Sequence, residues 1–164
     1  MPQTIPGVVF DCNVFWRAFF SRTGVGHECY RLIVEKKVIH FVSSTTVDEL
    51  VAVLSRPETL SKFTDLDSDD VEEFVRYVVS ISSLVRSVPH VFDLPRDVDD
   101  EPYIDLAIAA DADYLVTSDR DLLDLMFGID DASKEFRQRF RNIKVVRPDE
   151  FLRIIAETGL SLAP

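Results

Sequence analysis

Cysteine is scarce in this chain of 164 residues, which contains only Cys12 and Cys29. Two cysteines at that spacing match no zinc-binding pattern and are too few for the disulfide framework of a small secreted domain. Long apolar runs are also missing, because no stretch approaches the ~18 residues that cross a membrane. The first residues show no basic region leading into an apolar segment, which argues against a secretory signal. We therefore expect a cytoplasmic protein that does not enter a membrane.

Positive charge is in deficit as well. The chain has 18 Lys and Arg against 29 Asp and Glu, a formal net charge of -11 at pH 7. This balance argues against a protein that coats nucleic acid through a broad basic face. It leaves open an enzyme that meets nucleic acid locally through bound cations and a few arginines. A basic partner, or an acidic surface that serves only solubility, is equally compatible with it.

What the chain does contain is typical of one globular domain. Hydrophobic residues make up 46% and charged residues 29%, and no linker, repeat or low-complexity segment divides residues 1–164. Short apolar runs alternate with segments of helical periodicity, which predicts right-handed βαβ units. We expect an α/β protein, a three-layer α/β/α sandwich with a mostly parallel sheet of about five strands. The expected strands cover residues 7–10, 38–42, 83–91, 114–116 and 142–146.

Polar side chains follow two of these strands directly. Val8-Val9-Phe10 runs straight into Asp11, and Tyr114-Leu115-Val116 leads through two hydroxyl residues into Asp119. Ligands of open parallel sheets bind beyond the carboxyl ends of the strands, where a carboxylate can meet a metal ion or a phosphate. The alternative at each position is a turn residue that bonds its own backbone.

Two further acids lie on expected helices. Asp105 is the only charge within residues 104–110, which are apolar nearly all round. A buried carboxylate is costly unless it is paired or bound to a cation, so Asp105 is either a ligand or the partner of an arginine. Glu49 lies off the apolar stripe of its helix. Because Thr46-Val47-Asp48-Glu49 also matches a capping box, Glu49 is either a ligand or a helix cap.

Taken in order, these motifs resemble the PIN domain, a family of metal-dependent ribonucleases that includes VapC-type toxins. Within that family the chain is most similar to the toxin components of toxin–antitoxin systems. Each motif alone is weakly specific, but six in the family's order cover nearly the whole chain. The matching segments are residues 8–13, 47–57, 97–101, 105–110, 112–123 and 147–152.

The resemblance implies residue roles and a chemistry. The implied catalytic and metal-binding acids are Asp11, Glu49, Asp105 and Asp119. The implied supporting or rim positions are Asn13, Asp100, Thr117, Ser118 and Asp121. Such hard oxygen ligands suit Mg²⁺ or Mn²⁺, which can activate water for in-line attack on an RNA phosphodiester. The resemblance also implies a homodimer, and a cognate antitoxin protein as partner.

Residues 126–141 depart from the family, which passes quickly from its Asp-Leu-Leu motif to the last strand. Helical spacing puts Arg137 and Arg141 on one face of this insertion and Phe136 and Phe140 on the neighbouring face. We expect the phenylalanines to hold the helix against the protein and the two arginines to bind the RNA substrate. The alternatives are arginines paired with nearby acids, or a surface that docks an acidic antitoxin tail.

Two other function classes remain alternatives. The first is a PIN-like module that binds RNA or protein without cleaving, although all four acids are present. The second is an aspartyl-phosphate phosphatase or receiver domain. That class fits less well, because the phosphatase needs a second Asp where this chain has Asn13 and the receiver needs paired acids where Asp11 stands alone.

Overall fold

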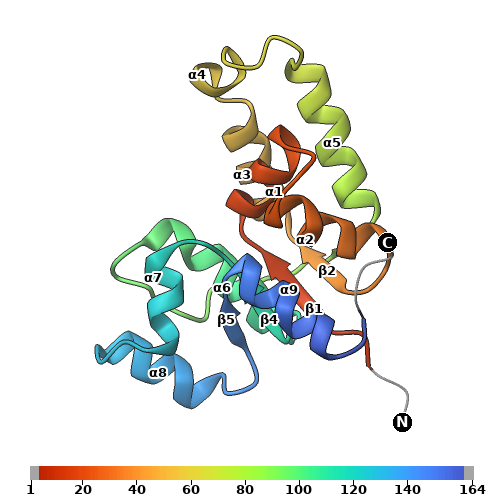
Figure 1. Cartoon of the computed structure of the whole chain (residues 1–164). Coiled ribbons are helices and arrows are strands. Elements are labelled where there is room, and N and C mark those ends of the chain that lie inside the picture. Colours follow the sequence, from red (N-terminus) through yellow and green to blue (C-terminus); the bar gives the residue numbers. More distant parts are fainter. Residues whose placement is uncertain (1–3, 161–164) are drawn as a thin grey trace.

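A five-stranded sheet with the order β3-β2-β1-β4-β5 lies at the centre of the protein, seen here in a computed structural model that describes residues 4–160 (Figure 1). All four strand pairings are parallel, which confirms the predicted class. The strands are β1 (Gly7–Phe10), β2 (Ile39–Val42), β3 (Ser83–Leu84), β4 (Tyr114–Val116) and β5 (Lys144–Val146). The strand expected over residues 83–91 is thus reduced to its first two residues.

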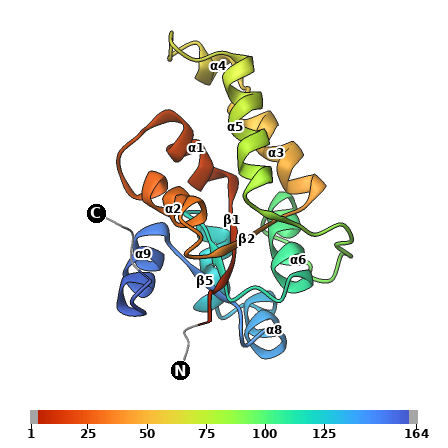
Figure 2. The same ribbon diagram turned by 90° about the vertical axis from the view of Figure 1, so that its right-hand side faces the viewer.

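Helices cover both faces of this sheet, because both faces of its central strand are apolar. Val8 and Phe10 pack on one side and Val9 on the other, as the alternation of side chains along a strand requires. Figure 2 shows α2 and α9 on one side and α6 and α8 on the other. The α-helices are α1 (Cys12–Phe20), α2 (Val25–Val34), α3 (Ser44–Leu54), α4 (Pro57–Leu60), α5 (Ser68–Ser80), α6 (Glu101–Ala109), α7 (Arg120–Leu123), α8 (Asp131–Arg139) and α9 (Pro148–Glu157).

Two short 3₁₀ turns complete the elements, η1 (Val98–Asp100) before α6 and η2 (Asp124–Met126) after α7. The helices α3, α4 and α5 extend beyond the edge of the sheet, at the top of Figure 1. Within residues 4–160, none of the helices is long and apolar enough to span a bilayer. The central strand β1 and its neighbour β4 both contact α6, and α6 in turn contacts η1 and α3.

Candidate metal centre at the carboxyl edge of the sheet

Asp11 and Thr117 are neighbours because β1 and β4 pair in register. Phe10 lies opposite Val116, so the residues that follow the two strands meet at the same edge. The Thr117 hydroxyl donates to Asp11 Oδ2 at 2.7 Å, and the Asn13 side-chain amide donates to the same oxygen at 3.2 Å. Asp11 is only 4% exposed, and burial is the main cause that raises the pKa of its carboxyl. The predicted supporting roles of Asn13 and Thr117 thus correspond to direct contacts with Asp11.

Asp119 is held at the same edge by backbone hydrogen bonds. Its amide donates to the Thr117 hydroxyl at 2.9 Å, and its carboxylate accepts the amide of Asp121 at 2.8 Å. Asp121 therefore contributes a backbone amide to this site through that bond. Ser118 lies between the two anchored residues and is partly exposed.

Asp97, Asp100 and Asp119 form a cluster in which one oxygen from each lies within 4.8 Å of the others. Asp100 ends η1 and is 8% exposed. Burial raises the pKa of the Asp100 carboxyl well above its usual range, and the negative charges of Asp119, Asp11 and Asp97 raise it further. Like charges held this close favour any cation that can lie between them.

Unpaired polar atoms are concentrated here. Among the buried side chains of residues 4–160, four polar atoms have no hydrogen bond of good geometry, and three of them are Asn13 Oδ1, Asp100 Oδ2 and Tyr103 Oη. The fourth is His40 Nε2, in the core. Each such atom costs about 1–3 kcal/mol. Because Asn13 contacts Asp11, and Asp100 belongs to the cluster, the donor set and its unused oxygens fit a divalent cation with oxygen ligands.

Glu49 faces the cluster from α3 and is not a helix cap. The cap of α3 is Ser43, whose hydroxyl accepts the amide of Thr46, and Thr46 returns the bond. Burial raises the pKa of the half-buried Glu49 carboxyl, and the charges of Asp11 and Asp99 raise it further, whereas the nearby Tyr103 hydroxyl lowers it. The capping interpretation of Glu49 is therefore wrong, and its electrostatic neighbours are those of the acidic cluster.

Asp105 is buried, as expected, but the structure does not bring it to this cluster. One of its oxygens accepts the amides of Val91 and Phe92 at 2.9 and 3.0 Å, and the other lies 2.8 Å from His90 Nδ1. Hydrogen bonds to Asp105 and Asp93 raise the pKa of His90 to about 9, so this imidazole is charged at neutral pH. Asp105 thus holds the segment before α6, and its oxygens contact two backbone amides and His90 instead of the expected metal or arginine.

The position of Asp105 follows from the direction of α6. The helix starts at the carboxyl edge of the sheet with Asp100 as its N-cap. Asp105 is five residues further on and is therefore displaced from Asp100 by about 7.5 Å along the helix axis. Asp100, which the sequence suggested only as a rim residue, therefore lies where Asp105 was expected. The acidic run before Pro102 was the signal that could have identified it, because it places Asp100 at the helix start.

The profile of the PIN domain family matches residues 7–121. The chain belongs to the PIN domain family. PIN domains are generally nucleases and typically bind divalent metals, and this membership disfavours the aspartyl-phosphate alternative. The matched range includes all five candidate acids, Asp11, Glu49, Asp100, Asp105 and Asp119.

A solved structure supports the same fold. The crystal structure of PAE2754 from Pyrobaculum aerophilum is similar to this PIN domain with a TM-score of 0.55 and 15% sequence identity, over 93% of this chain and 90% of that one. Identity at that level shows the fold alone. A search of curated proteins finds no match.

The insertion at 126–141 lies outside the matched PIN segment. Its phenylalanines pack as predicted, but its arginines do not lie as predicted. Phe136 and Phe140 pack on Phe92, with ring centroids 5.6 and 6.2 Å away, as predicted for a helix pinned to the protein. The helix α8 ends at Arg139, so Arg137 and Arg141 do not share a helical face.

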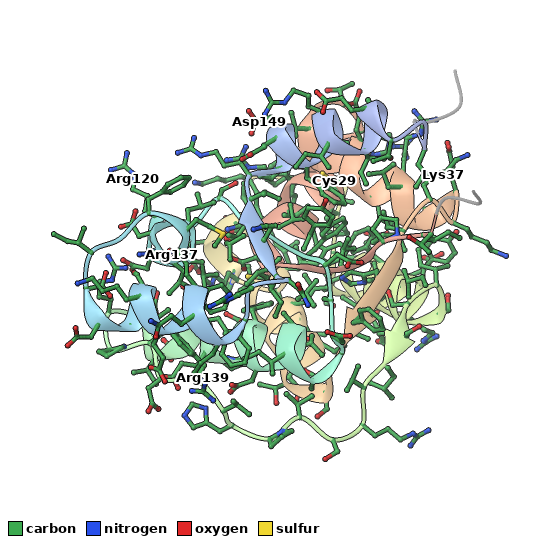
Figure 3. The ribbon with its side chains drawn as sticks, turned by 90° about the horizontal axis from the view of Figure 1, so that it is seen from below. Cys29, Lys37, Arg120, Arg137, Arg139 and Asp149 are labelled. Atoms are coloured by element: carbon green, nitrogen blue, oxygen red, sulfur yellow. The ribbon has the colours of Figure 1, made fainter. Side chains whose placement is uncertain are left out.

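The two arginines also lie in unsuitable places for the predicted substrate role. The Arg137 guanidinium donates to the carbonyls of Leu125 at 2.9 Å and Gly128 at 2.7 Å, so it holds a turn of its own insertion. Arg141 lines a hollow with Tyr114 and Lys144, the first residues of β4 and β5, at the edge opposite the acids. Arg120, directly after Asp119, is exposed and extends from α7 at the margin of the molecule in Figure 3.

Proposed function

We propose that this PIN domain is a divalent-metal-dependent ribonuclease. The ligands are the carboxylates of Asp11, Asp100 and Asp119, with Glu49 facing them from α3. The observation that carries the proposal is the buried Asp100 Oδ2, which has no hydrogen-bond partner and lies beside two other carboxylates. Oxygen-only ligands favour Mg²⁺ or Mn²⁺. This set replaces Asp105 by Asp100 and keeps the other three predicted acids.

The residues of this chain prepare the site for hydrolysis of a phosphodiester bond. The chemistry supplied by a bound Mg²⁺ or Mn²⁺ is activation of water and stabilisation of charge on phosphate oxygens. Thr117 and Asn13 fix the Asp11 carboxylate through the two hydrogen bonds described above. The Asp121 amide orients Asp119. These contacts hold the ligands before a cation arrives, which reduces the reorganisation that binding requires.

The same proposal includes the biological role. We infer that the substrate is RNA, that the protein acts in the cytoplasm as the toxin of a toxin–antitoxin pair, and that it forms a homodimer with a cognate antitoxin as partner. What supports these assignments is the resemblance of the sequence motifs to toxin components. The acidic surface, with its net charge of -11, is compatible with a basic partner.

Cleavage of a mixed panel of fluorescently labelled RNAs tests the proposed activity. We expect cleavage with Mg²⁺ or Mn²⁺, none with excess chelator, and recovery when Mn²⁺ is restored. DNA strands of the same sequences, run in parallel, separate a ribonuclease from a general nuclease. Asp119→Asn should be inactive, whereas the matched control Asp48→Asn, on the exposed side of α3, should be fully active. Cleavage that persists in chelator, or in Asp119→Asn, would overturn the proposal.

A further inference from the structure

The hydroxyl of Tyr103 is a buried polar group beside the acidic site that the proposed function does not yet use. Tyr103 lies in the first turn of α6 and is 1% exposed. Its Oη atom has no hydrogen bond of good geometry, although a buried tyrosine hydroxyl usually has a partner. A phenylalanine would fill the same apolar space without burying an unpaired hydroxyl. The presence of the hydroxyl therefore indicates a specific acceptor.

Tyr103 connects the two elements that carry the acids. Its ring packs with Leu106 and Phe92 in the core beneath α6. The same side chain also lines a small internal hollow together with Cys12 and Leu50, and Leu50 is the residue after Glu49 on α3. The helices α3 and α6 contact each other, so the hydroxyl end of Tyr103 faces the helix that carries Glu49.

Glu49 is the acceptor that best suits this hydroxyl. The electrostatic neighbours of Tyr103 Oη are Cys12, Asp11 and Glu49. Burial, with Asp11 and Glu49 nearby, raises the pKa of the Cys12 thiol, so Cys12 stays neutral and is a weak acceptor. Asp11 Oδ2 already accepts the Thr117 hydroxyl and the Asn13 amide. The nearby Tyr103 hydroxyl lowers the pKa of the Glu49 carboxyl, as a donor does when it faces an ionised carboxylate.

We propose that Tyr103 is a positioning residue, whose hydroxyl donates to the Glu49 carboxylate in the cation-bound protein and holds it at the cation site. This inference rests on the proposed function. Glu49 needs such a donor, because its long side chain is only half-buried and the charges of Asp11, Asp97 and Asp99 repel it. A fixed donor inside the protein offsets that repulsion and removes the rotamer freedom that a cation would otherwise have to restrict.

Mn²⁺ binding to Tyr103→Phe, measured by isothermal titration calorimetry, tests the inference without depending on RNA cleavage. We expect the Kd for Mn²⁺ to rise about 10-fold, the lower range for loss of a residue that supports a ligand. The thermal unfolding temperature of the metal-free variant should be unchanged or higher, since a buried hydroxyl without a good hydrogen bond is removed. The matched control is Tyr114→Phe, at the opposite end of β4, which should bind Mn²⁺ as the wild type does.

Glu49→Gln provides the second arm of the test. In that background, adding Tyr103→Phe should change the Kd for Mn²⁺ by less than about twofold, because the two residues act as one unit. An unchanged affinity in Tyr103→Phe, or an equal loss in both backgrounds, would overturn the role of Tyr103 and leave the proposed function standing. A wild-type protein that binds no Mn²⁺ would instead overturn the proposed function, and with it this role.

Discussion

Asp100→Asn is expected to remove measurable Mn²⁺ binding and to slow RNA cleavage by at least ~100-fold, because the cation loses one of its carboxylate ligands. Asparagine keeps the shape of the side chain and removes its charge. The thermal unfolding temperature of the metal-free protein should stay the same or rise. The reason is that a buried carboxylate next to Asp119, Asp11 and Asp97 is replaced by a neutral group.

The matched control for this variant is Asp105→Asn, which makes the same chemical change one and a half helical turns further along α6. Asparagine at 105 keeps an oxygen for the amides of Val91 and Phe92. We therefore expect Mn²⁺ affinity and cleavage rate to stay within about threefold of the wild type. The opposite ranking, with Asp105→Asn inactive and Asp100→Asn active, would return the ligand role to Asp105.

Asp105→Ala is expected to lower the free energy of unfolding by about 3 kcal/mol, because a buried pair of amide donors loses its acceptor. Those donors belong to Val91 and Phe92, and the charged His90 loses a partner at the same time. Urea unfolding of the metal-free protein, followed by circular dichroism, measures the change.

Asp93→Ala is the control for that measurement. Asp93 contacts the other nitrogen of His90 at 2.8 Å, and its side chain is 85% exposed, so its loss should cost less than about 0.5 kcal/mol. If Asp105→Ala were as stable as Asp93→Ala, Asp105 would have no structural role at the segment before α6. Its burial would then need another explanation.

The sequence was sufficient for the parallel pairing of the strands, though not for the length of β3, and for the acids that follow β1 and β4. Val8-Val9-Phe10 and Tyr114-Leu115-Val116 are apolar on both faces, which marks buried parallel strands. The position of Asp11, directly after its strand, then follows from topology alone. Short-range pattern and chain order determine these features, so no knowledge of loop packing was needed.

The partners of Asp105 could not be predicted from the sequence. Its apolar neighbours correctly predicted burial, at 5% exposure, but they could not reveal what it meets inside. Its partners come from residues 90–92, an irregular segment without helical or strand periodicity, whose path is set by packing of Phe92 and Leu94. Because every residue except proline has a backbone amide, the sequence does not distinguish a carboxylate that binds amides from one that binds a metal.

The capping alternative for Glu49 and the expected direction of Arg137 failed for local reasons. The Thr46-Val47-Asp48-Glu49 string fits a capping box, but β2 ends at Val42 and the helix begins three residues earlier than that pattern implies, at the Ser43 cap. Arg137 was expected to point outward, yet a tight turn at Gly128 presents carbonyls to it. A Cβ at Gly128 would lie 2.9 Å from the backbone carbonyl oxygen of Asp124, so the turn depends on a glycine whose effect is not visible from helical spacing.

The position of Mn²⁺ in crystals of the protein, located by its anomalous diffraction, identifies the carboxylates that bind the cation. We expect a peak bonded to carboxylate oxygens of Asp100 and Asp119, on the side of the site where Asp11 and Glu49 lie, at the carboxyl edge of β1 and β4. We expect no peak bonded to Asp105, whose oxygens remain with His90 and the two amides. A peak at Asp105, or crystals saturated with Mn²⁺ that show none at Asp100 and Asp119, would exclude the proposed ligand set.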